Sequence, residues 1–575
     1  MPAMTDGRAI IDDIGDTGAM SWDDAVALVT QPGGRFAMTE AEIDGHTVPV
    51  FENAPPSLRV LFELSGAGYA DKPFLVYEDE RSTFAETVAA AGSVGHLLVD
   101  RYGIESGDRV AIVMRNYPEW IQAFMAITSV GAIAVAMNAW WTTDELDYGL
   151  RDCGARLVIA DEERVERIEP LHADLCLQVV AVRATGPLPD GVDRFEDVID
   201  PGASMPDVDV APDDDAVILY TSGTTGHPKG AVSTHRAVIT ALLAFGCRAA
   251  VNAARFPKER DHPFDTAYIL IVPLFHATGL IPVHLGCVAA GSKLVVMYKW
   301  DPDRALELIE RERVTAFVGV PTMSWDLLQS PDFDRRDTSS LQSVGGGGAP
   351  APPELVRRIE ENFPRGRPAI GYGMTETNAY GPQNAGDDYI RKPTSTGRAV
   401  PALAVQIHDE DGNEVPVGEV GEICFKGASV IRGYWNKPEA TAETIRDGWM
   451  RSGDIGRVDD EGFIYVEDRA KDMVLRAGEN VYSAEVEAAI YEVPGVREAA
   501  VFGLPHERLG EEVACAVVTN DDFDRDTFET HLAEKLAPFM IPSVVELRTE
   551  TLPRNANGKI LKRALRDQLG DASRR

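Results

Sequence analysis

The stretch YTSGTTGHPKG, residues 220–230, is the most informative part of this 575-residue chain. It combines hydroxyl side chains, three glycines and a lysine immediately after an apolar run. Glycines allow backbone N–H groups to turn toward an anion, hydroxyls add hydrogen-bond donors, and a lysine adds a positive charge. We therefore predict a loop that binds a polyphosphate. The residues expected to contact it are Thr221, Ser222, Gly223, Thr224, Thr225, Gly226 and Lys229.

The residues that flank this loop indicate an α/β fold. Residues 216–220 (AVILY) are typical of a buried strand and residues 235–245 (HRAVITALLAF) of a helix. The loop is therefore expected at a strand-to-helix turn, where α/β proteins bind ligands. A flexible linker is the alternative for a segment of this composition. A Walker phosphate loop is excluded, because its lysine directly follows a glycine, whereas Pro228 separates Gly226 from Lys229.

The chain is strongly acidic, with a formal net charge of -37 from 92 acidic and 55 basic residues. A field of this sign argues against nucleic acid as a partner and against binding to an anionic membrane surface. An acidic protein that binds a polyphosphate must gather positive charge and a divalent cation where the phosphates lie. The sequence therefore predicts a magnesium site.

Cysteine usage and apolar patterning bear on location. The six cysteines lie far apart without a CxxC pair, which indicates neither a disulfide framework nor a zinc site. Residues 1–16 are acidic where a signal peptide would be basic and then apolar. The most apolar stretch, 268–297, contains two prolines, two histidines and three glycines, so we read it as strand, turn, helix and strand. We expect a cytoplasmic protein without an integral membrane segment.

The chain is too long for a single hydrophobic core. From about residue 75 to 345, short β-branched runs alternate with helical stretches, which predicts parallel sheets covered by helices. Between about 398 and 468, short strands joined by turns predict a small antiparallel barrel or sheet. We expect an N-terminal domain over 1–471 and a C-terminal α+β domain over 472–575, in which Ser483 caps a helix.

Four further polar, glycine-rich segments follow the first. Taken in order with residues 220–230, they resemble the motifs of the AMP-forming adenylating enzymes, the superfamily of acyl-CoA synthetases, nonribosomal adenylation domains and luciferases. The resemblance covers nearly the whole chain, from about residue 50 to 566. The four segments are GGGGAP (345–350), GYGMTET (371–377), RSGD (451–454) with DRAKD (468–472), and RNANGK (554–559).

The resemblance implies a fold and a reaction. The fold is a large N-terminal domain of two helix-covered parallel sheets with a small β-barrel-like subdomain, followed by a mobile α+β lid. A carboxylic acid attacks the α-phosphorus of ATP to give acyl-AMP and pyrophosphate, and CoA then takes the acyl group and releases AMP. The implied partners are a carboxylic acid, ATP with Mg²⁺, and CoA. A homodimer is compatible with this reading.

The resemblance also assigns residues to the triphosphate. Residues 221–230 would hold the β- and γ-phosphates, Glu376 would bind Mg²⁺, and Thr375 would donate to the α-phosphate. Lys559 would approach the attacking carboxylate and the α-phosphate as charge develops. Taken singly, Glu376 is equally well read as a solvated loop acid, and Lys559 as one basic residue of a C-terminal helix.

Other residues would hold the nucleoside. Asp454 would bind the ribose hydroxyls with help from Arg469, although alone it reads as a turn residue. Tyr372 would stack on the adenine, beside a flat wall that carries few side chains. The wall and its neighbouring glycines are Gly347, Gly348, Ala349, Pro350, Gly371 and Gly373.

Lys559 and Glu376 belong to different expected domains, so the domains must close for the first half-reaction. In this family the smaller domain is thought to rotate about a hinge, which matches Asp472 here. The loop 476–480 would then replace Lys559 near the adenylate, with room for the pantetheine thiol beside its glycine. The residues expected at the thioester-forming step are Gly478, Glu479 and Asn480.

The acyl site is the least defined part of this reading. His276 in PLFHATG matches a position where relatives place an aromatic residue or a histidine beside the acyl carbonyl, although a lone histidine among apolar residues is more often a core residue. FHATG has no aspartate for a substrate ammonium, which favours an acid without an α-amino group. The candidates for an acyl pocket, each with core packing as its alternative, are Phe245, Gly246, Val320, Pro321 and Trp325.

Trp140 and Trp141 resemble the NAWW segment of bacterial fatty-acyl ligases, although core packing is the commoner role for either residue. A fatty acid is the expected substrate, and its chain length stays open. Three alternatives stay open at this point. They are an aryl-acid–CoA ligase, an acyl-AMP ligase that loads a carrier protein, and a catalytically idle nucleotide- or acyl-binding protein. The intact Lys559, Glu376 and Asp454 argue against the idle protein.

Overall fold

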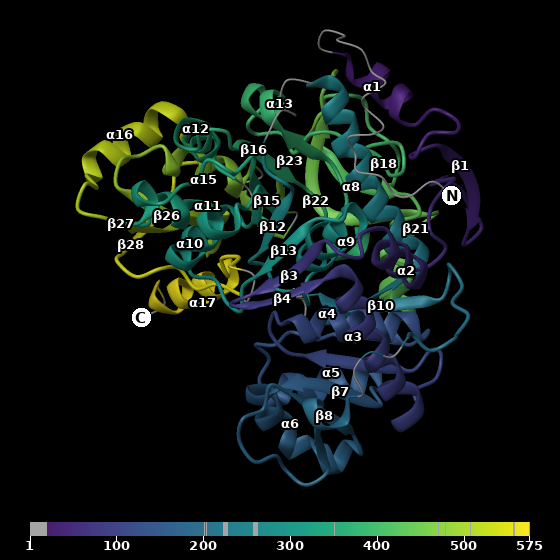
Figure 1. Cartoon of the computed structure of the whole chain (residues 1–575). Helices are drawn as coiled ribbons and strands as arrows, with labels where there is room; N and C mark the ends of the chain where they lie inside the picture. Colours follow the sequence, from purple (N-terminus) through teal and green to yellow (C-terminus); the bar gives the residue numbers. More distant parts are fainter. Residues whose placement is uncertain are drawn as a thin grey trace.

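The computed structural model describes residues 20–199, 202, 204–221, 228–256, 263–349, 351–469, 471–477, 479–506, 508–555 and 558–573. In these residues, two eight-stranded sheets and two five-stranded sheets contain nearly all of the β-strands (Figure 1). The two large sheets are mainly parallel and covered by helices, so the expected α/β fold is confirmed.

The first large sheet has the strand order β20-β11-β10-β6-β5-β7-β8-β9. The six strands β10, β6, β5, β7, β8 and β9 are parallel to their neighbours. Most of them are continuous apolar runs, because both of their faces are buried. β11 and β20 extend the sheet in antiparallel fashion. The strands are β5 (Arg109–Val113), β6 (Ile133–Ala136), β7 (Leu157–Asp161), β8 (Gln178–Val182), β9 (Val192–Arg194), β10 (Asp215–Thr221), β11 (Lys229–Thr234) and β20 (Gly433–Tyr434).

The second large sheet has the order β17-β16-β15-β14-β12-β13-β3-β4. It is parallel from β16 to β3 and ends in one antiparallel strand on each side. The strands are β3 (Pro73–Tyr77), β4 (Glu80–Thr83), β12 (Ala267–Leu270), β13 (Lys293–Val296), β14 (Ala316–Gly319), β15 (Ser343–Gly347), β16 (Arg367–Gly371) and β17 (Gln383–Ala385).

Helices α3 (Phe84–His96) and α4 (Pro118–Ser129) lie between the two large sheets (Figure 1). Thr83 and Glu86 form a capping box at the start of α3, and Pro118 occupies the first turn of α4, where its missing N–H costs nothing. The outer helices include α5 (Thr143–Cys153), α6 (Glu162–Leu175), α10 (Pro302–Glu312), α11 (Pro321–Gln329) and α12 (Pro353–Asn362).

The structure corrects the expected surroundings of the hydroxyl-rich loop. The chain leaves β10 at Thr221 and returns as β11, so the loop joins two antiparallel strands and does not lead directly into a helix. Helix α8 (His235–Arg255) begins only after β11. The prediction missed β11 because its first three residues, Lys, Gly and Ala, are depleted in strands, and its strand conformation depends on pairing with β10 and β20.

Among the described residues, one helix, α8, is long and apolar enough to cross a membrane. In its most apolar window 67% of the residues are buried inside the protein, as in a core helix. The apolar stretch 268–297 contains β12, a π-helical segment (Gly279–Leu285), α9 (Gly286–Ala290) and β13. The expected succession of strand, turn, helix and strand is therefore confirmed.

A third sheet is antiparallel and five-stranded, in the order β18-β19-β22-β21 with β23 beside β22. It is an open sheet, and its strands fall within the range in which a small barrel or sheet was expected. The strands are β18 (Ala404–His408), β19 (Gly421–Lys426), β21 (Ile445–Arg446), β22 (Trp449–Val458) and β23 (Ile464–Arg469).

The C-terminal unit has one sheet with helices on both faces. Helices α15 (Ser483–Tyr491) and α16 (Arg525–Lys535) share one apolar cluster, and α17 (Lys562–Ser573) packs into another. The strands are β24 (Val474–Arg476), β25 (Glu479–Val481), β26 (Val496–His506), β27 (Gly510–Thr519) and β28 (Val544–Arg548). Below we call residues 472–573 the lid and the preceding residues the large lobe.

Ser483 is not the cap of α15, contrary to the prediction. Tyr482 occupies the capping position without a side-chain bond, and Ser483 is the first helical residue. The hydroxyl of Ser483 instead donates to Asp468 on β23, at 3.0 Å. A long-range contact therefore replaces the local one, which sequence spacing does not reveal.

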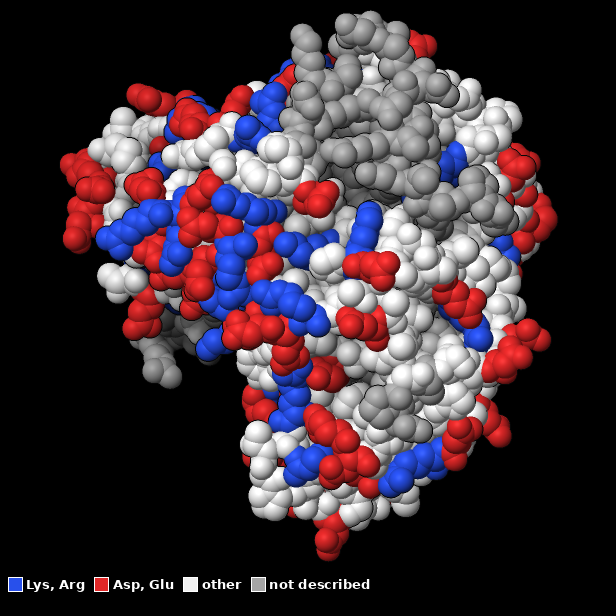
Figure 2. Space-filling view, viewed as in Figure 1, with Lys and Arg blue, Asp and Glu red and all other residues white. Residues whose placement is uncertain are grey.

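The surface mixes both signs of charge despite the negative total. Figure 2 shows lysines and arginines interspersed with aspartates and glutamates on the side that carries α10, α12 and the lid. Many of them form ion pairs, for example Arg357 with Glu354 and Glu361. Exposed pairs of this kind contribute little to stability. They place charges of opposite sign next to each other on this side of the surface.

Candidate active site

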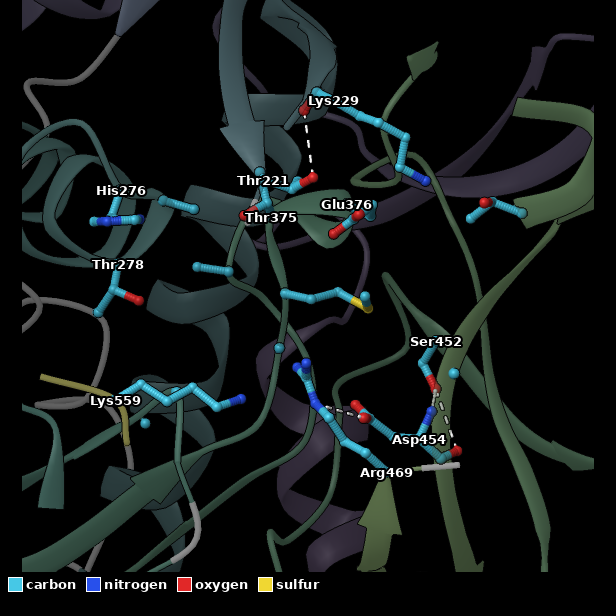
Figure 3. A pocket seen from close by; sticks show the side chains of 18 of the residues that line it. Thr221, Lys229, His276, Thr278, Thr375, Glu376, Ser452, Asp454, Arg469 and Lys559 are labelled. Atoms are coloured by element: carbon cyan, nitrogen blue, oxygen red, sulfur yellow. Dashed lines mark hydrogen bonds and ion pairs between the residues drawn. The ribbon is translucent and has the colours of Figure 1, made fainter. Parts of the chain in front are cut away.

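Two adjoining cavities, of about 670 and 240 Å³, lie between the large lobe and the lid. Residues from both lobes line each cavity, and the two cavities share Asp454, Arg469 and Lys559. Figure 3 shows Lys559 entering from the side opposite Lys229 and Glu376. The carboxyl ends of β10, β14, β15 and β16 form part of the wall, as expected for ligand sites of parallel sheets.

The structure brings most of the predicted residues to these cavities. Seven lie outside the described residues: Ser222, Gly223, Thr224, Thr225, Gly226, Pro350 and Gly478. The larger cavity is lined by Thr221, Lys229, His276, Val320, Gly347, Gly348, Gly373, Thr375, Glu376, Asp454, Arg469, Asp472 and Lys559. The smaller cavity adds Pro321, Trp325, Ala349, Gly371 and Tyr372.

The ends of the hydroxyl-rich loop are held together by the sheet. Thr221 faces Lys229 across the β10–β11 pair, and its hydroxyl donates to the Lys229 carbonyl oxygen at 3.3 Å. The Lys229 ammonium lies 3.9 Å from the ring centroid of Tyr434, a cation–π contact. The positive charge of Lys229 is thereby held where the loop ends, in a position to bind a phosphate.

Glu376 is buried, with 7% of its surface exposed, in a short 3-10 turn (Thr375–Thr377) after β16. The chain turns back immediately afterwards through Asn378 and Ala379, which both have positive φ. The hydroxyl of Tyr434 donates to Glu376 Oε1 at 2.7 Å. Burial, with help from Glu376, raises the pKa of Tyr434 well above its usual value, so the phenol stays protonated and keeps donating.

Sequence reasoning missed Tyr434. It lies in RGYWN, residues 432–436, where an aromatic residue carries no recognisable signal. Its role depends on the antiparallel pairing of β20 with β11, which places Ala231 opposite Tyr434. Strand pairing between segments about two hundred residues apart therefore builds the environment of the expected magnesium ligand.

Asp454 and Arg469 face each other on β22 and β23. The carboxylate of Asp454, 5% exposed, accepts a hydrogen bond from the Tyr372 hydroxyl at 2.6 Å and lies 3.2 Å from Arg469 Nε. The Tyr372 ring also packs against Phe425, with the centroids 5.7 Å apart. Asp454 is thus held rigidly and presents hydrogen-bond acceptors, which suits a pair of vicinal hydroxyls.

The glycine-rich segments are flat because neighbouring backbone leaves no room for side chains. A Cβ on Gly347 would lie 2.5 Å from the Gly371 carbonyl oxygen, and one on Gly373 would lie 2.3 Å from that of Ala379. Gly348 has φ of +78° and closes the segment in the left-handed region. The resulting bare surface can accept a planar ring.

Lys559 comes from the turn that precedes α17. Its amide N–H donates to the Asn555 side-chain oxygen at 3.0 Å, and Arg554 donates to the Gly558 carbonyl oxygen at 2.7 Å. Burial and then the positive charge of Arg469 lower the pKa of Lys559 to about 8, while Asp472 and Asp454 oppose the shift. A cation that is costly to bury is thus held at the cavity, ready to pair with an anion.

Glu479 and Asn480, two of the residues expected at the thioester-forming step, lie away from the two cavities. Both are exposed on the β24–β25 hairpin and line neither of the two cavities. The backbone N–H of Asp472 donates to the Arg469 carbonyl oxygen at 2.9 Å, where the chain passes from β23 to the lid. The lid therefore presents Lys559, and not the hairpin, to the cavities.

The proposed acyl residues separate into two groups. Val320, Pro321, Trp325 and His276 reach the cavities, and burial lowers the pKa of His276 to about 3, so its imidazole is neutral. Phe245 and Gly246 do not reach them. Helix α8 directs Phe245 against the Tyr380 ring, 5.1 Å between centroids, so this side chain serves packing. Gly246 is exposed, and a Cβ there would lie 3.3 Å from the Phe36 ring.

No group of three or more histidine, cysteine, aspartate or glutamate side chains that could bind a metal occurs in the described part of the chain. Mg²⁺ is commonly bound by one or two carboxylates together with substrate phosphates, so a single buried carboxylate could serve as its protein ligand. Glu376, which accepts a hydrogen bond from Tyr434, is one of several carboxylates that line the larger cavity and fits this role.

Known proteins resemble this chain along most of its length. The family model described as AMP-binding enzyme matches residues 62–435, and that described as AMP-binding enzyme C-terminal domain matches residues 485–559. Feruloyl-CoA synthase of Amycolatopsis sp is 38% identical over 474 residues, covering 81% of this chain and 90% of that protein. Long-chain-fatty-acid–CoA ligase FadD13 of Mycobacterium tuberculosis is 35% identical over 495 residues, covering 85% and 93%. The crystal structure of ATP-bound MatB from Rhodopseudomonas palustris has a TM-score of 0.78 at 32% identity, covering 90% and 99%.

Proposed function

Because the chain belongs to the AMP-binding enzyme family and is an AMP-forming acyl-CoA ligase, we propose that the acid it activates is a fatty acid. The lining of the larger cavity supports this choice, since it includes His276 and the apolar residues Val272, Ala277, Val320 and Ala379. The similarity to a long-chain-fatty-acid–CoA ligase points the same way. An aryl acid is the second candidate, favoured by the greater identity to feruloyl-CoA synthase.

The observation that carries the mechanism is that Lys559 of the lid and Glu376, Asp454 and Lys229 of the large lobe line one cavity. A carboxylate must approach the α-phosphate of ATP, and two charges of the same sign at contact repel by about 4 kcal/mol at intermediate dielectric. Lys559 would offset this repulsion at the reacting atoms, and Lys229 would offset the charge of the leaving pyrophosphate.

The first half-reaction forms a bond between a carboxylate oxygen and the α-phosphorus and breaks the bond to pyrophosphate. Asp454 and Arg469 would position the ribose, and Thr375 would donate to an α-phosphate oxygen. Mg²⁺ bound at Glu376 would neutralise the phosphates. In the second half-reaction the CoA sulfur bonds to the acyl carbon, the thiol proton is released and AMP leaves.

The lysine assignment is tested with Lys559→Ala. We expect acid-dependent pyrophosphate release to fall by about 100-fold or more, the effect of removing a preorganised charge. Thioester formation from preformed acyl-AMP should be largely kept. Lys535→Ala, an exposed lysine on the lid paired with Glu492, is the matched control and should leave both steps unchanged. Equal loss of both half-reactions in Lys559→Ala would contradict the assignment.

The substrate is tested by incubating the enzyme with ATP, Mg²⁺ and a panel of fatty and aryl acids, with and without CoA, and detecting thioesters by mass. We expect kcat/KM for the best fatty acid to exceed that for ferulate by about tenfold or more, a difference of about 1.4 kcal/mol. A preference for ferulate would establish the aryl-acid reading. Adenylate formation without any CoA adduct would instead favour a carrier-loading enzyme.

Mg²⁺ is the expected metal, so EDTA should abolish adenylate formation and Mg²⁺ should restore it.

We further expect the enzyme to act in the cytoplasm, which fits the buried reduced state of five of its six cysteines. Light scattering at micromolar concentration would test the homodimer.

A further inference from the structure

Asp468 lies on β23, directly before Arg469, and is 6% exposed. Its Oδ1 accepts hydrogen bonds from the Ser483 hydroxyl at 3.0 Å and from the Arg469 amide at 2.7 Å. Its Oδ2 accepts a hydrogen bond from the Ser483 amide. A carboxylate that is buried and bonded in this way is costly to leave without its partners.

Lys562 joins the same cluster from the other side. Its ammonium donates to the Ser483 hydroxyl at 2.7 Å and lies 2.7 Å from Glu487 Oε1. Glu487 in turn accepts from the Val501 amide at 2.8 Å, so α15, α17 and β26 are tied together. Lys562 follows Lys559 by three residues, and the cluster therefore fixes the start of α17 close to the lysine that enters the active site.

The cluster spans the expected hinge. Asp468 precedes Asp472, whereas Ser483, Glu487 and Lys562 follow it. A rotation about Asp472 would carry Ser483 away from Asp468 and break both of their hydrogen bonds. The contacts of Lys562 with Ser483 and Glu487 lie within the lid and would persist. The Asp468–Ser483 contact therefore belongs to one orientation of the lid.

We propose that Asp468 is a positioning residue that, through Ser483 and Lys562, selectively holds the lid in the orientation that forms acyl-AMP. This inference rests on the proposed lid rotation and on the proposed role of Lys559. Asp468 lines the smaller cavity beside Arg469, but its hydrogen bonds across the hinge go to Ser483 of the lid. Loss of the Asp468–Ser483 contact should favour the other orientation. Ser483→Ala leaves Asp468 and its bond to the Arg469 amide in place, so it separates this effect from any change at Arg469.

The first test measures the two half-reactions separately in Asp468→Asn and in the milder Ser483→Ala. We expect acyl-AMP formation to fall by about tenfold or more, as for loss of a buried charge-assisted bond, and thioester formation from preformed acyl-AMP to stay equal or rise. Asp161→Asn is the matched control. Asp161 is also a buried aspartate, 4% exposed, but its partners Arg115 and Arg164 belong to the large lobe.

A second control tests whether loss of any hydrogen bond between the lobes has the same effect as loss of the Asp468–Ser483 contact. Arg497 of the lid donates to Gln329 on α11 at 3.4 Å on the surface. Gln329→Ala should leave the ratio of the two half-reaction rates unchanged. Asp161→Asn should lower the thermal midpoint without changing that ratio, which shows that destabilisation alone does not produce the effect.

The orientation itself is read by energy transfer between dyes. Cys176 is the exposed cysteine of the large lobe, and Glu529→Cys on α16 supplies a second thiol on the lid. We expect Asp468→Asn to shift transfer efficiency in the presence of ATP toward the value that the unsubstituted, equally labelled protein shows with CoA. An unchanged efficiency, or equal loss of both half-reactions in both variants, would overturn the proposal.

These outcomes also separate this proposal from the function it rests on. If the unsubstituted enzyme forms no acyl-AMP with any acid of the panel, the proposed function fails. If it forms acyl-AMP but Asp468→Asn and Ser483→Ala leave the half-reaction ratio unchanged, the positioning role alone fails. If Asp468→Asn is insoluble, Ser483→Ala decides, because it removes only one hydroxyl.

Discussion

At the scale of single residues, Lys559 gives the clearest consequence for pH. Burial and Arg469 lower the pKa of Lys559 to about 8, so the ammonium is present below that pH and lost above it. Because the free enzyme governs kcat/KM, we expect kcat/KM for acyl-AMP formation to fall about tenfold per unit above pH 8. Stopped-flow or pyrophosphate assays across pH 6.5–10 would measure this limb.

The control for the pH limb is Lys559→Arg, because a guanidinium stays charged over this range. Its residual activity should show no decline near pH 8. At saturating ATP the bound phosphates should raise the pKa of Lys559, which would move the limb of kcat to higher pH. A limb near pH 8 that persists in Lys559→Arg would assign it to another group.

Tyr434 yields a second prediction at this scale. Tyr434→Phe removes the hydrogen bond to Glu376 Oε1 and leaves the ring beneath Lys229 in place. The carboxylate becomes less fixed, so we expect the KM for MgATP to rise about fivefold, from a loss of about 1 kcal/mol. Steady-state kinetics at several Mg²⁺ concentrations would measure it.

Tyr102→Phe is the matched control for Tyr434→Phe. Tyr102 also donates to a carboxylate, that of Asp193, at 2.6 Å, and it lines neither cavity. This variant should lose a comparable amount of stability without any change in the KM for MgATP. A similar rise in both variants would mean that the effect of Tyr434 is one of stability.

At the scale of elements, β15 shows why glycines occupy 345–347, the last three positions of this strand. A Cβ on Gly346 would lie 1.5 Å from the carbonyl oxygen of Gly319 on the neighbouring strand β14. We expect Gly346→Ala to destabilise the large lobe by about 3 kcal/mol or more and to lower its thermal midpoint by about 6 °C. Scanning calorimetry would measure the change.

Gly348→Ala gives the comparison within the same motif. Gly348 has φ of +78°, but its nearest neighbour to a new Cβ is Val320 Cγ1 at 3.9 Å. Only the cost of the left-handed conformation remains, about 1–2 kcal/mol. Equal destabilisation of both variants would show that backbone approach at Gly346 is not the reason for its glycine.

The strand β11 illustrates what local sequence leaves open. Residues 216–220 predicted β10, because a short run of apolar and β-branched residues is typical of a buried strand. KGAVST, residues 229–234, carries no such run, and it is a strand because β10 and β20 supply hydrogen bonds on both sides. The hydroxyl-rich loop therefore joins two strands, an arrangement set by pairing across the sheet.

At the scale of the whole molecule, the net charge of -37 opposes the approach of an anionic nucleotide. Charges more than about 10 Å away are screened at 0.1 M salt, whereas the contacts of the bound phosphates are screened much less. We therefore expect kcat/KM for MgATP to rise a few-fold from about 10 to 150 mM salt, with kcat unchanged.

The salt prediction is checked with sodium chloride, potassium chloride and choline chloride at equal ionic strength. The same rise in all three would show that screening, and not a specific cation, is responsible. A steady fall in kcat/KM with salt would mean that Lys229, Arg469 and Lys559 dominate the approach of the nucleotide.

The sequence by itself determined the fold class, the order of the polar loops and the family, because apolar periodicity and glycine-rich turns are local properties that survive in one dimension. Only the tertiary structure decided that Tyr434 hydrogen-bonds to Glu376, that Phe245 packs against Tyr380, and that Ser483 hydrogen-bonds to Asp468. These facts depend on strand pairing and on the orientation of the lid. Both join residues that lie far apart in the chain, and spacing along the sequence carries no record of such distances.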